Sequence, residues 1–235
     1  MKPSVIIPMY NESKIIAQSA KTLSEYMCSN FEEYEIIFFD DGSRDDSMRI
    51  VESLQLANVR VLGHTPNKGK GSAVREAMLS ASGDVKIFTD ADLAYGTDVI
   101  KKAVDLMASS EKTDIIIGSR NLGDDGYEGY TFKRKLMSKI YIKILCFVGG
   151  FKLSDSQCGF KAFRAQTATD IFSECSVDGF AFDFEAILIA NKKNKNITEM
   201  PVKIINHRES SVRPISDALK MLKDLRRIKK NVNSR

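Results

Sequence analysis

The stretch VKIFTDADL, residues 85–93, joins a buried-strand pattern directly to a pair of carboxylates. Residues 85–89 are almost all apolar or β-branched, which is typical of a strand covered by helices on both faces. Asp90 and Asp92 follow at a spacing of two, which places both side chains on one side of an extended chain. The stretch therefore predicts an internal strand that ends in an acidic site.

Four more short apolar runs predict further strands of the same sheet, at residues 4–8, 35–40, 59–63 and 114–118. The segments between them have helical periodicity, at residues 13–28, 45–55, 71–82 and 98–109. This alternation is typical of an α/β fold with a mostly parallel central sheet and helices on both faces. Ligands of such sheets bind at the carboxyl ends of the strands. We therefore expect the site in the loops that begin at Tyr10, Asp40, His64, Asp90 and Ser119.

The second part of the chain has a different pattern. A Gly- and Asp-rich loop follows Arg120, and a basic and apolar stretch runs over residues 133–151. Strand-like pieces at 158–163 and 197–205 enclose an expected helix at 183–193, and a final helix is expected at 214–230. A length of 235 residues is enough for one domain with a substantial core, so we expect a single domain over residues 1–235.

Composition favours a globular protein that stays inside the cell. Hydrophobic residues make up 43% and charged residues 28% of the chain. The four cysteines form no C-x-x-C pair, and the N-terminal residues show no secretion signal, so we expect reduced thiols and a cytosolic location. The longest apolar stretch, residues 140–151, contains Lys143 and is shorter than the ~20 residues of a spanning helix. We expect no transmembrane segment.

Charge is distributed unevenly along the chain. The net charge is +4, but residues 192–235 carry 13 Lys or Arg against 4 Asp or Glu, which leaves residues 1–191 at −5. Such a basic end favours an anionic partner, either lipid headgroups or nucleic acid. Because residues 192–235 contain no aromatic side chain for base stacking, we expect no nucleic-acid binding.

The pair Asp90 and Asp92 offers hard oxygen ligands of the kind that Mg²⁺ or Mn²⁺ prefers, with phosphates and water completing the shell. The alternative is that Asp92 only caps a helix. Two other strand ends are also acidic, at PMYNE (8–12) and DDGS (40–43). Three acidic strand ends would repel one another unless cations or hydrogen-bond donors were present, so the pattern predicts a site for a metal and a polar ligand.

A glycine-containing turn, NKGKGS, spans residues 67–72. It lacks the first glycine of a P-loop, so we do not interpret it as one. Its glycines predict either a close approach of the backbone to a ligand or a plain strand-to-helix turn.

Taken together, these strings resemble glycosyltransferase family 2. The matching segments are VIIPMYNE, DDGSRD, NKGKGSAVREAM, DADL, GSR, KRKLMSK, DSQCGFKAF, HRESSVRP and MLKDLRRIKK. The resemblance implies a GT-A (nucleotide-diphospho-sugar transferase) fold. DSQCGFKAF and the basic C-terminal helix resemble the polyprenyl-phosphate (dolichyl-phosphate) glucosyl- and mannosyltransferases, and the Q-x-x-R-W string of processive synthases is absent.

The resemblance implies roles for residues on the donor side. Asp90 and Asp92 correspond to the metal and diphosphate pair, with Ala91 between them. The mannosyl type often has a Gln two residues after this pair, whereas this chain has Ala94, which favours the glucosyl type. The other residues implied to surround the nucleotide are Pro8, Tyr10, Asn11, Glu12, Asp40, Asp41, Lys68 and Gly69.

On the acceptor side the resemblance implies that Arg120 and Arg134 hold a phosphate and are catalytic, which suits the fork of a guanidinium. A loop that ends Gly-Ser-Lys or Gly-Ser-Arg in the family reads Ser210-Ser211-Val212 here, so its charge would come from Arg208 or Arg213. The remaining acceptor candidates are Ser119, Asp155, Gln157 and Ser211. A general base is not obligatory for an anionic phosphate; its candidates are Asp155, Asp183 and Glu185, of which Asp155 and Glu185 could instead pair with Lys161 or an arginine.

The activity implied by the resemblance is inverting transfer of a hexose from a UDP-glucose or GDP-mannose type of donor to a polyprenyl or dolichyl phosphate. Residues 1–120 would form the nucleotide-sugar half, residues 121–213 the acceptor half with an amphipathic interface helix, and residues 214–235 a basic C-terminal helix. The protein would then be peripheral on the cytosolic face of a membrane. Its oligomeric state stays open.

Two segments predict the membrane contact. In the first, the apolar residues are Met137, Ile140, Tyr141, Ile144 and Leu145. In the C-terminal segment they are Ile215, Leu219, Leu222, Leu225 and Ile228, which could equally pack on the protein's own domain. Two other functions stay open: transfer to a glycan, protein or small soluble acceptor in cell-surface polysaccharide synthesis, and a non-enzymatic module that binds a nucleotide sugar.

Overall fold

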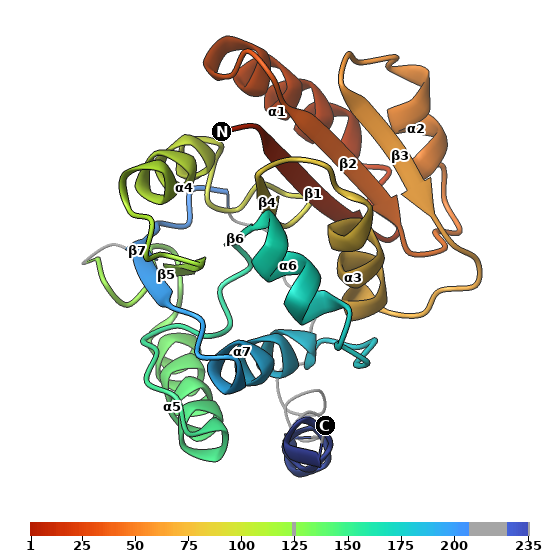
Figure 1. Ribbon diagram of the computed structural model, residues 1–235. Helices are drawn as coiled ribbons and strands as arrows, with labels where there is room; N and C mark the ends of the chain where they lie inside the picture. Colours follow the sequence, from red (N-terminus) through yellow and green to blue (C-terminus); the bar gives the residue numbers. More distant parts are fainter. Residues whose placement is uncertain (124–125, 207–224, 235) are drawn as a thin grey trace.

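A seven-stranded sheet lies at the centre of the molecule (Figure 1). The computed structural model describes residues 1–123, 126–206 and 225–234. The strands are β1 (Pro3–Met9), β2 (Glu35–Asp40), β3 (Val59–Gly63), β4 (Val85–Phe88), β5 (Ile115–Ser119), β6 (Lys161–Arg164) and β7 (Ile197–Pro201). All five strands expected in the first half are confirmed within one or two residues.

The sheet order is β3-β2-β1-β4-β6-β5-β7, and every neighbouring pair is parallel except those that involve β6. β6 runs antiparallel to both β4 and β5 and separates them. The mostly parallel sheet is therefore confirmed. The segment that precedes β6 consequently reaches the edge where the parallel strands end, since an antiparallel strand begins there.

Helices cover both faces of the sheet. One face packs against α1 (Ile16–Asn30), α2 (Ser47–Ser53) and α4 (Asp98–Ser109), and the other against α3 (Lys70–Ser80), α6 (Ala165–Phe172) and α7 (Phe182–Lys192). The apolar side chains of β1 alternate between the two cores: Val5 and Ile7 face the first and Ile6 the second. This arrangement explains why the central strands read as continuous apolar runs.

The two edge strands differ from the central ones. We expected residues 59–63 to be buried on both faces, but β3 lies at one edge and its residues are half-buried or exposed. β7 forms the other edge and is likewise only partly buried. The expectation was wrong for β3 because an apolar run does not reveal whether a strand has one neighbour or two.

Several elements of the second half depart from the expected bounds. The strand expected at 158–163 begins at Lys161, the strand expected at 197–205 ends at Pro201, and α6 was not expected. The basic apolar stretch forms a long helix, α5 (Phe132–Gly149), beside α7. No helix in the described part of the chain is long and apolar enough to span a membrane.

The C-terminal helix packs on the protein itself. Residues 225–234 are helical, and Leu225, Ile228 and Val232 are buried in the core that α7 also joins. Lys229 Nζ donates to the carbonyl of Val148 at the end of α5 (2.6 Å). For Leu225 and Ile228 the expected lipid contact is therefore wrong, and the alternative of packing on the domain is correct. Ile215, Leu219 and Leu222 lie outside the described residues.

Candidate active site

The ends of β1, β2 and β4 meet at one edge of the sheet, because β1 lies between the other two and all three are parallel. The loop after β1 is tied to the loop after β2 by backbone donors. The backbone N–H of Asn11 donates to Ser43 Oγ (2.9 Å), and the N–H of Arg44 donates to Asn11 Oδ1 (2.8 Å). Asn11 has a φ of 56°, a left-handed conformation that asparagine tolerates better than most residues. The expected crevice is thus built from two interlocked loops.

The residues of the first loop lie at different depths. Pro8 is buried within β1. The last residue of β1 that pairs with β4 is Ile6, so the missing N–H of Pro8 removes no hydrogen bond between these two strands. Tyr10 is exposed at the edge, and the N–H of Glu12 donates to Ser47 Oγ (2.7 Å). Of these residues, Tyr10 is the one whose side chain is open to a ligand from solvent.

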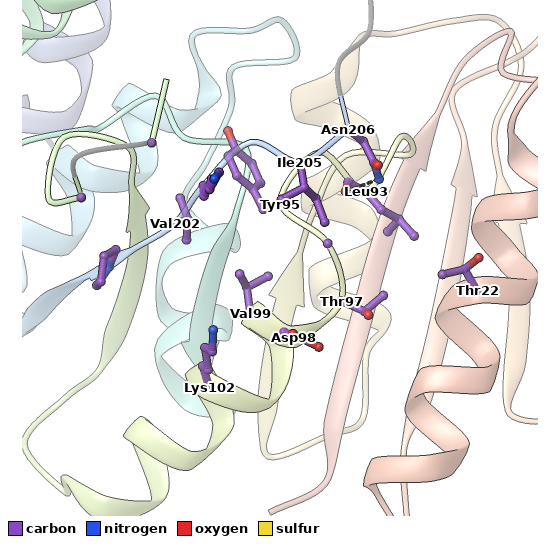
Figure 2. A pocket seen from close by; sticks show the side chains of 15 residues that line it. Thr22, Leu93, Tyr95, Thr97, Asp98, Val99, Lys102, Val202, Ile205 and Asn206 are labelled. Carbon is purple, nitrogen blue, oxygen red and sulfur yellow. Dashed lines mark hydrogen bonds between the residues drawn. The ribbon is translucent and has the colours of Figure 1, made fainter. Parts of the chain in front are cut away.

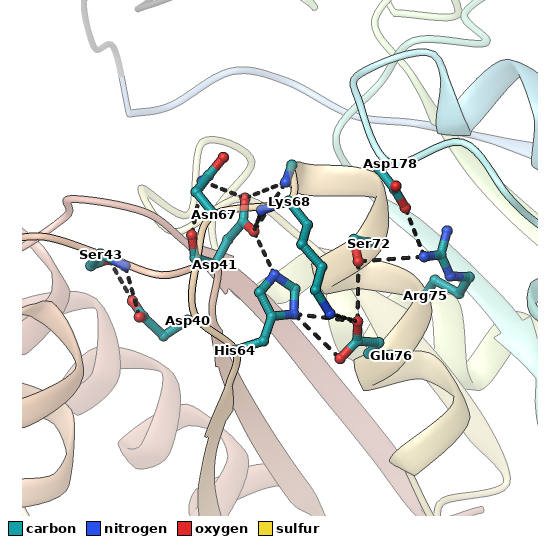
Figure 3. A network of polar contacts seen from close by, with 11 residues as sticks. Asp40, Asp41, Ser43, His64, Asn67, Lys68, Ser72, Arg75, Glu76 and Asp178 are labelled. Carbon is teal, nitrogen blue, oxygen red and sulfur yellow. Dashed lines mark hydrogen bonds and ion pairs between the residues drawn. The ribbon is translucent and has the colours of Figure 1, made fainter.

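Asp40, the last residue of β2, and Asp41, which follows it, are both buried and accept hydrogen bonds from the protein. Asp40 accepts from the N–H of Ser43 (2.9 Å). Asp41 accepts from His64 Nε2 (2.7 Å), Asn67 Nδ2 (2.7 Å) and the N–H groups of Lys68 (2.8 Å) and Gly69 (2.9 Å). On its other side His64 faces Glu76 of α3, with Nδ1 3.3 Å from the carboxylate (Figure 3). We call Asp41, His64, Asn67 and Glu76 the Asp41 cluster.

Asp90 has a different kind of partner. Its Oδ1 forms an ion pair with Nζ of Lys70, the first residue of α3. Burial works to lower the pKa of Lys70, but Asp90 and, more weakly, Asp183 and Asp92 outweigh it and raise the pKa above its ordinary value. The Asp90 side chain keeps a third of its surface exposed. A charged carboxylate and a charged ammonium thus stand at the end of β4.

Asp92 lies in the turn after β4. Its Oδ1 accepts from the N–H of Ala94 (3.1 Å), so it stabilises that turn rather than the start of α4, which begins at Asp98. The alternative of a helix cap is therefore wrong for Asp92. Ala91, between the two aspartates, is buried in the core. The turn is further held by Asn206, whose Nδ2 donates to the carbonyl of Leu93 (3.0 Å).

The backbone of Gly159, which has no side chain, packs against the Asp90 carboxylate. A Cβ atom added at Gly159 would stand 2.1 Å from Asp90 Oδ2, so only glycine fits there without moving the carboxylate. The N–H of Gly159 points to the hydroxyl of Tyr95 (3.3 Å). The DSQCGF string thus reaches the acidic pair because it precedes β6 and arrives at the same sheet edge.

The acidic pair fits a divalent cation. Among the described residues no group of three or more His, Cys, Asp or Glu side chains converges as a complete protein cage would require. Two carboxylates, of which Asp90 is partly open to solvent, suit a hard cation that keeps several waters and takes its other ligands from phosphates. Asp90 and Asp92 would hold such an ion.

Of the three candidates for a general base, Asp183 interacts electrostatically with Asp90 of this pair. It forms an ion pair with Lys161 Nζ (2.8 Å), and it acts electrostatically on both Lys70 and Asp90. Burial raises the pKa of Asp183, and Lys161 opposes that rise. Glu185 instead accepts from the N–H groups of Ser176 (2.8 Å) and Val177 (2.7 Å), which makes it a support of that loop.

The third candidate, Asp155, is bound to Arg120. Arg120 donates from Nε (2.6 Å) and Nη2 (2.9 Å) to the two oxygens of Asp155, and both residues are buried. The ring of Tyr127 lies 5.0 Å from the guanidinium carbon. Asp155 therefore pairs with an arginine and not with Lys161, one of the two pairings left open. Two predicted acceptor residues occupy each other with a bidentate bond.

Other predicted acceptor residues are buried or lie outside the described part. Ser119 is buried and shares a hydrogen bond with Ser154 (2.5 Å), whereas Gln157 is half-buried. Arg134 lies in the first turn of α5, and its side chain is not described. Arg208, Ser211 and Arg213 lie outside the described residues.

The glycines of the 67–72 turn are explained by the protein itself. A Cβ at Gly69 or Gly71 would collide with the carbonyl of Asp178 (2.5 Å) or Val177 (2.4 Å). The carbonyl of Asp178 also accepts from the N–H of Gly71 (2.7 Å), which satisfies the start of α3. Gly69 has a φ of 116°, which other residues rarely adopt. The structure supports the strand-to-helix turn, with a loop of the second half packed on it.

A cavity of about 620 Å³ lies behind the Asp92 turn (Figure 2). Its walls are formed by residues 93, 95–99, 201–203, 205 and 206, together with Thr22, Lys102, Gly123 and Gly126. No predicted site residue in the described part of the chain lines it. It is therefore separate from the Asp90 carboxylate and its Lys70 partner.

Sequence reasoning missed two contacts at the site. Lys70 stood inside a motif that we had quoted, but its reach to Asp90 depends on how the turn before α3 folds. Gly159 stood in DSQCGF, but its contact with Asp90 depends on the antiparallel course of β6. Neither contact leaves a signal in sequence spacing, because 20 and 69 residues separate the partners.

Comparisons with known proteins agree with this geometry. A family model described as Glycosyl transferase family 2 matches residues 4–172. The dolichyl-phosphate β-glucosyltransferase of Dictyostelium discoideum is 34% identical over 96% of this chain and 73% of its own length. The enzymes of the same name from Saccharomyces cerevisiae and Homo sapiens are 28% and 29% identical, over 94% of this chain and 72% and 73% of their own lengths.

Solved structures support the fold. Glucosyl-3-phosphoglycerate synthase from Mycobacterium tuberculosis, in complex with Mn²⁺, UDP-glucose and phosphoglyceric acid, superposes with a TM-score of 0.74. The match covers 99% of this chain and 80% of the other at 18% identity. The complex of the same enzyme with UDP alone gives a TM-score of 0.74 at 17% identity, over 97% and 80% of the two chains. The expected GT-A fold is thereby confirmed.

Proposed function

Because this chain is a glycosyltransferase that belongs to glycosyl transferase family 2, we propose that it transfers glucose from UDP-glucose to a polyprenyl phosphate at a membrane surface. The relatives named for dolichyl-phosphate β-glucosyltransfer support the acceptor and the sugar. The structural neighbours solved with UDP support the base, together with Ala94 at the position where the mannosyl type often has Gln.

On the donor side, Asp90 and Asp92 would hold a Mg²⁺ or Mn²⁺ ion, which would supply positive charge to the departing diphosphate. Asp90 and Lys70 bring one negative and one positive charge to the place where that diphosphate is held. Tyr10 at the crevice edge and the loop of Asn11 and Glu12 surround the nucleotide, with Asp40, Asp41, Lys68 and Gly69 beneath it.

The transfer step is a single in-line displacement. An oxygen of the acceptor phosphate attacks the anomeric carbon, the bond from that carbon to the diphosphate oxygen breaks, and the configuration inverts. A phosphate monoester is already anionic near neutral pH, so the step does not depend on a strong base. Arg134, with Arg208 or Arg213, would hold this phosphate at attacking distance.

The observation that carries the lipid acceptor is the exposed face of α5. Phe132 is 83% exposed and Phe147 is 88% exposed, one at each end of the helix. Between them the exposed apolar side chains are Leu136, Met137, Ile140 and Ile144. Lys139 and Lys143 are exposed on the same helix and suit anionic headgroups. Of the five residues expected to contact lipid there, Met137, Ile140 and Ile144 are exposed and Tyr141 is half-buried. Leu145 is fully buried in the core, so its expected lipid contact is wrong. Such a row of large apolar groups on a surface helix supports membrane contact.

This face supports a peripheral protein at a membrane surface, and we propose the cytosolic leaflet as that surface. Residues 1–120 would serve as the nucleotide-sugar half and residues 121–213 as the acceptor half, with the basic residues 214–235 near the membrane. The second candidate function is transfer to a small soluble phosphate, since structural neighbours of the same fold are synthases of glucosyl-3-phosphoglycerate. α5 favours the lipid, because a soluble acceptor gives no reason for its exposed phenylalanines.

The test is transfer of labelled glucose from UDP-glucose to polyprenyl phosphate in vesicles with Mn²⁺. We expect label that partitions into organic solvent, and loss of this product on chelation of the metal. GDP-mannose as donor and 3-phosphoglycerate as acceptor are the competing arms; product from either in place of the lipid product overturns the corresponding assignment.

Two variants refine the acceptor side of this assay. Replacing Phe132 and Phe147 together by Ser should lower transfer on vesicles about 10-fold and leave nucleotide binding unchanged, because both lie on the exposed face of α5. Arg134→Ala should raise KM for the lipid phosphate more than KM for the donor. An equal effect on both constants would remove Arg134 from the acceptor site.

A further inference from the structure

His64 lies at the centre of the Asp41 cluster, and its ring contacts Asp41 and Glu76, which are 23 and 12 residues away in sequence. It is the first residue after β3, and its side chain is only 9% exposed. Its backbone N–H donates to the carbonyl of Asp40 (3.1 Å), and its ring meets the edge of Phe39 (5.3 Å between centroids). The imidazole is therefore held in one orientation by packing.

Both ring nitrogens face carboxylates. Nε2 lies 2.7 Å from Asp41 Oδ1, and Nδ1 lies 3.3 Å from Glu76. A neutral imidazole has one donor and one acceptor nitrogen, so it can donate to both carboxylates only when it is protonated. The third charged group at this place is Lys68, whose Nζ lies 3.3 Å from Glu76. His64 thereby links the end of β2 to α3 (Figure 3).

Asp41 connects His64 to the backbone of the 67–69 turn. Its two oxygens accept from the N–H groups of Lys68 and Gly69, and charge-assisted bonds of this kind are roughly twice as strong as neutral ones. Asn67 holds Asp41 from a second side, through both its carbonyl (2.8 Å) and its carboxylate (2.7 Å). The conformation of residues 67–69 is consequently fixed by one carboxylate, and the next residue is Lys70.

We propose that His64 is a positioning residue for the donor site, which acts through Asp41 on the 67–69 turn and so directs Lys70 to Asp90. His64, Asp41, the turn and Glu76 form a closed chain of contacts that begins and ends on α3. Lys70, at the first residue of this helix, is the point where the closed chain reaches the acidic pair. The proposal rests on the proposed function for the identity of the ligand, but the contacts do not depend on it.

The experiment measures binding of UDP, with Mn²⁺, by titration calorimetry. His64→Leu should weaken binding about 10-fold, and His64→Gln, which can still donate to Asp41, should recover part of that loss. The matched control is Glu35→Gln, at the start of β2, the strand that Asp41 follows at its other end. Glu35 is buried and accepts from Ser4 Oγ (2.6 Å) and the N–H of Ser82 (3.0 Å), so its loss also costs stability, but it should leave UDP binding unchanged.

A second measurement separates positioning from general stability. In a Lys70→Ala background, His64→Leu should cause a much smaller loss of UDP affinity than in the wild type, because the main residue through which it acts is gone. An undiminished effect of His64→Leu in that background overturns the proposal. Equal weakening of binding by Glu35→Gln and His64→Leu overturns it as well.

A third measurement needs no ligand. Hydrogen exchange at the amides of Lys68 and Gly69 should be at least about 10-fold faster in His64→Leu than in Glu35→Gln. If the wild type binds neither UDP nor GDP with Mn²⁺, the proposed function fails, and this measurement still decides on His64. Unchanged exchange at the two amides would then show that the turn does not depend on His64.

Discussion

Asp41 and Asp90 follow two parallel strands at the same edge of the sheet, yet the protein treats them in opposite ways. Asp41 is buried and accepts from a ring, an amide and two backbone N–H groups, and the two N–H groups cannot turn away unless the turn unfolds. Asp90 is a third exposed, and its described partner is the flexible side chain of Lys70. The Asp41 carboxylate stabilises the fold, whereas the Asp90 carboxylate has a partner, Lys70, that a cation could replace.

This difference shows that acidic strand ends are not equivalent even when they lie in one crevice. A carboxylate whose partners are backbone groups contributes mainly to stability. A carboxylate whose partner is a long side chain is able to exchange it for a cation, because a lysine can rotate without a change in the backbone. Four substitutions test this difference between the two carboxylates.

The largest effect should come from removing a carboxylate of the acidic pair. We expect Asp92→Ala to lower kcat/KM for glucosyl transfer by about 10³-fold, equivalent to about 4 kcal/mol, while the fold persists. Steady-state kinetics with Mn²⁺, together with a circular dichroism spectrum, checks both parts. Undiminished turnover would show that Asp92 has no role in glucosyl transfer, and the acidic pair would then lose its assigned function.

Asp41→Ala should act on stability instead. It leaves the N–H groups of Lys68 and Gly69 unpaired, at a cost of about 3 kcal/mol in the free energy of unfolding. For a protein of this size that corresponds to a fall in Tm of roughly 6–12 °C. Asp90→Ala is the control, with an expected change within about 1 kcal/mol. A larger loss of stability from Asp90→Ala than from Asp41→Ala would reverse the comparison.

Lys70→Met tests whether the partner of Asp90 is exchangeable. Its ammonium is lost but its aliphatic length is kept, so we expect a change in Tm of only a few degrees. UDP binding in the presence of Mn²⁺ should weaken about 10-fold, or about 1.4 kcal/mol, because one positive charge at the diphosphate is gone. Tighter binding of UDP by this variant would mean that Lys70 obstructs the site.

The smallest effect should be a change in how steeply the free energy of unfolding falls at acid pH. Burial works to raise the pKa of Glu76, but hydrogen bonds from His64, Ser72 and Lys68 outweigh it and lower the pKa. A lowered pKa gives stability that is present above the ordinary value of 4.5 and is lost as pH falls through the folded-state value. Glu76→Gln should flatten this loss in denaturation curves between pH 7 and 3. An unchanged slope would contradict the assignment.

Much of the fold could be predicted from periodicity. The bounds of β2, β3 and α4 agree with expectation to the residue, because each segment has a clear apolar pattern between breakers. Strand direction could not be predicted: residues 158–163 read as a strand, but pairing with β4 and β5 decides that β6 is antiparallel. α6 was missed because it begins directly after β6 with no loop between them.

For the site, sequence reasoning located the strand ends but not the state of each side chain. It grouped Asp40 and Asp41 with Asp90 as acidic ends, and the burial of the first two became visible only with the folded turn. It also left Asp155 between two partners, and the bidentate contact with Arg120 decides the matter. Pairings of this kind depend on distances across the sheet, which residue spacing does not encode.

The position of β6 between β4 and β5 limits how such enzymes can be recombined. A fragment that ends at residue 120 would contain β4 and β5 but not the strand that joins them, and it would lose the carbonyl of Asp178 from the start of α3. The two halves named for donor and acceptor are therefore not separable folding units. A chimaera that takes its acceptor half from another enzyme would need to keep residues 151–179 together with the donor-half side chains that contact them.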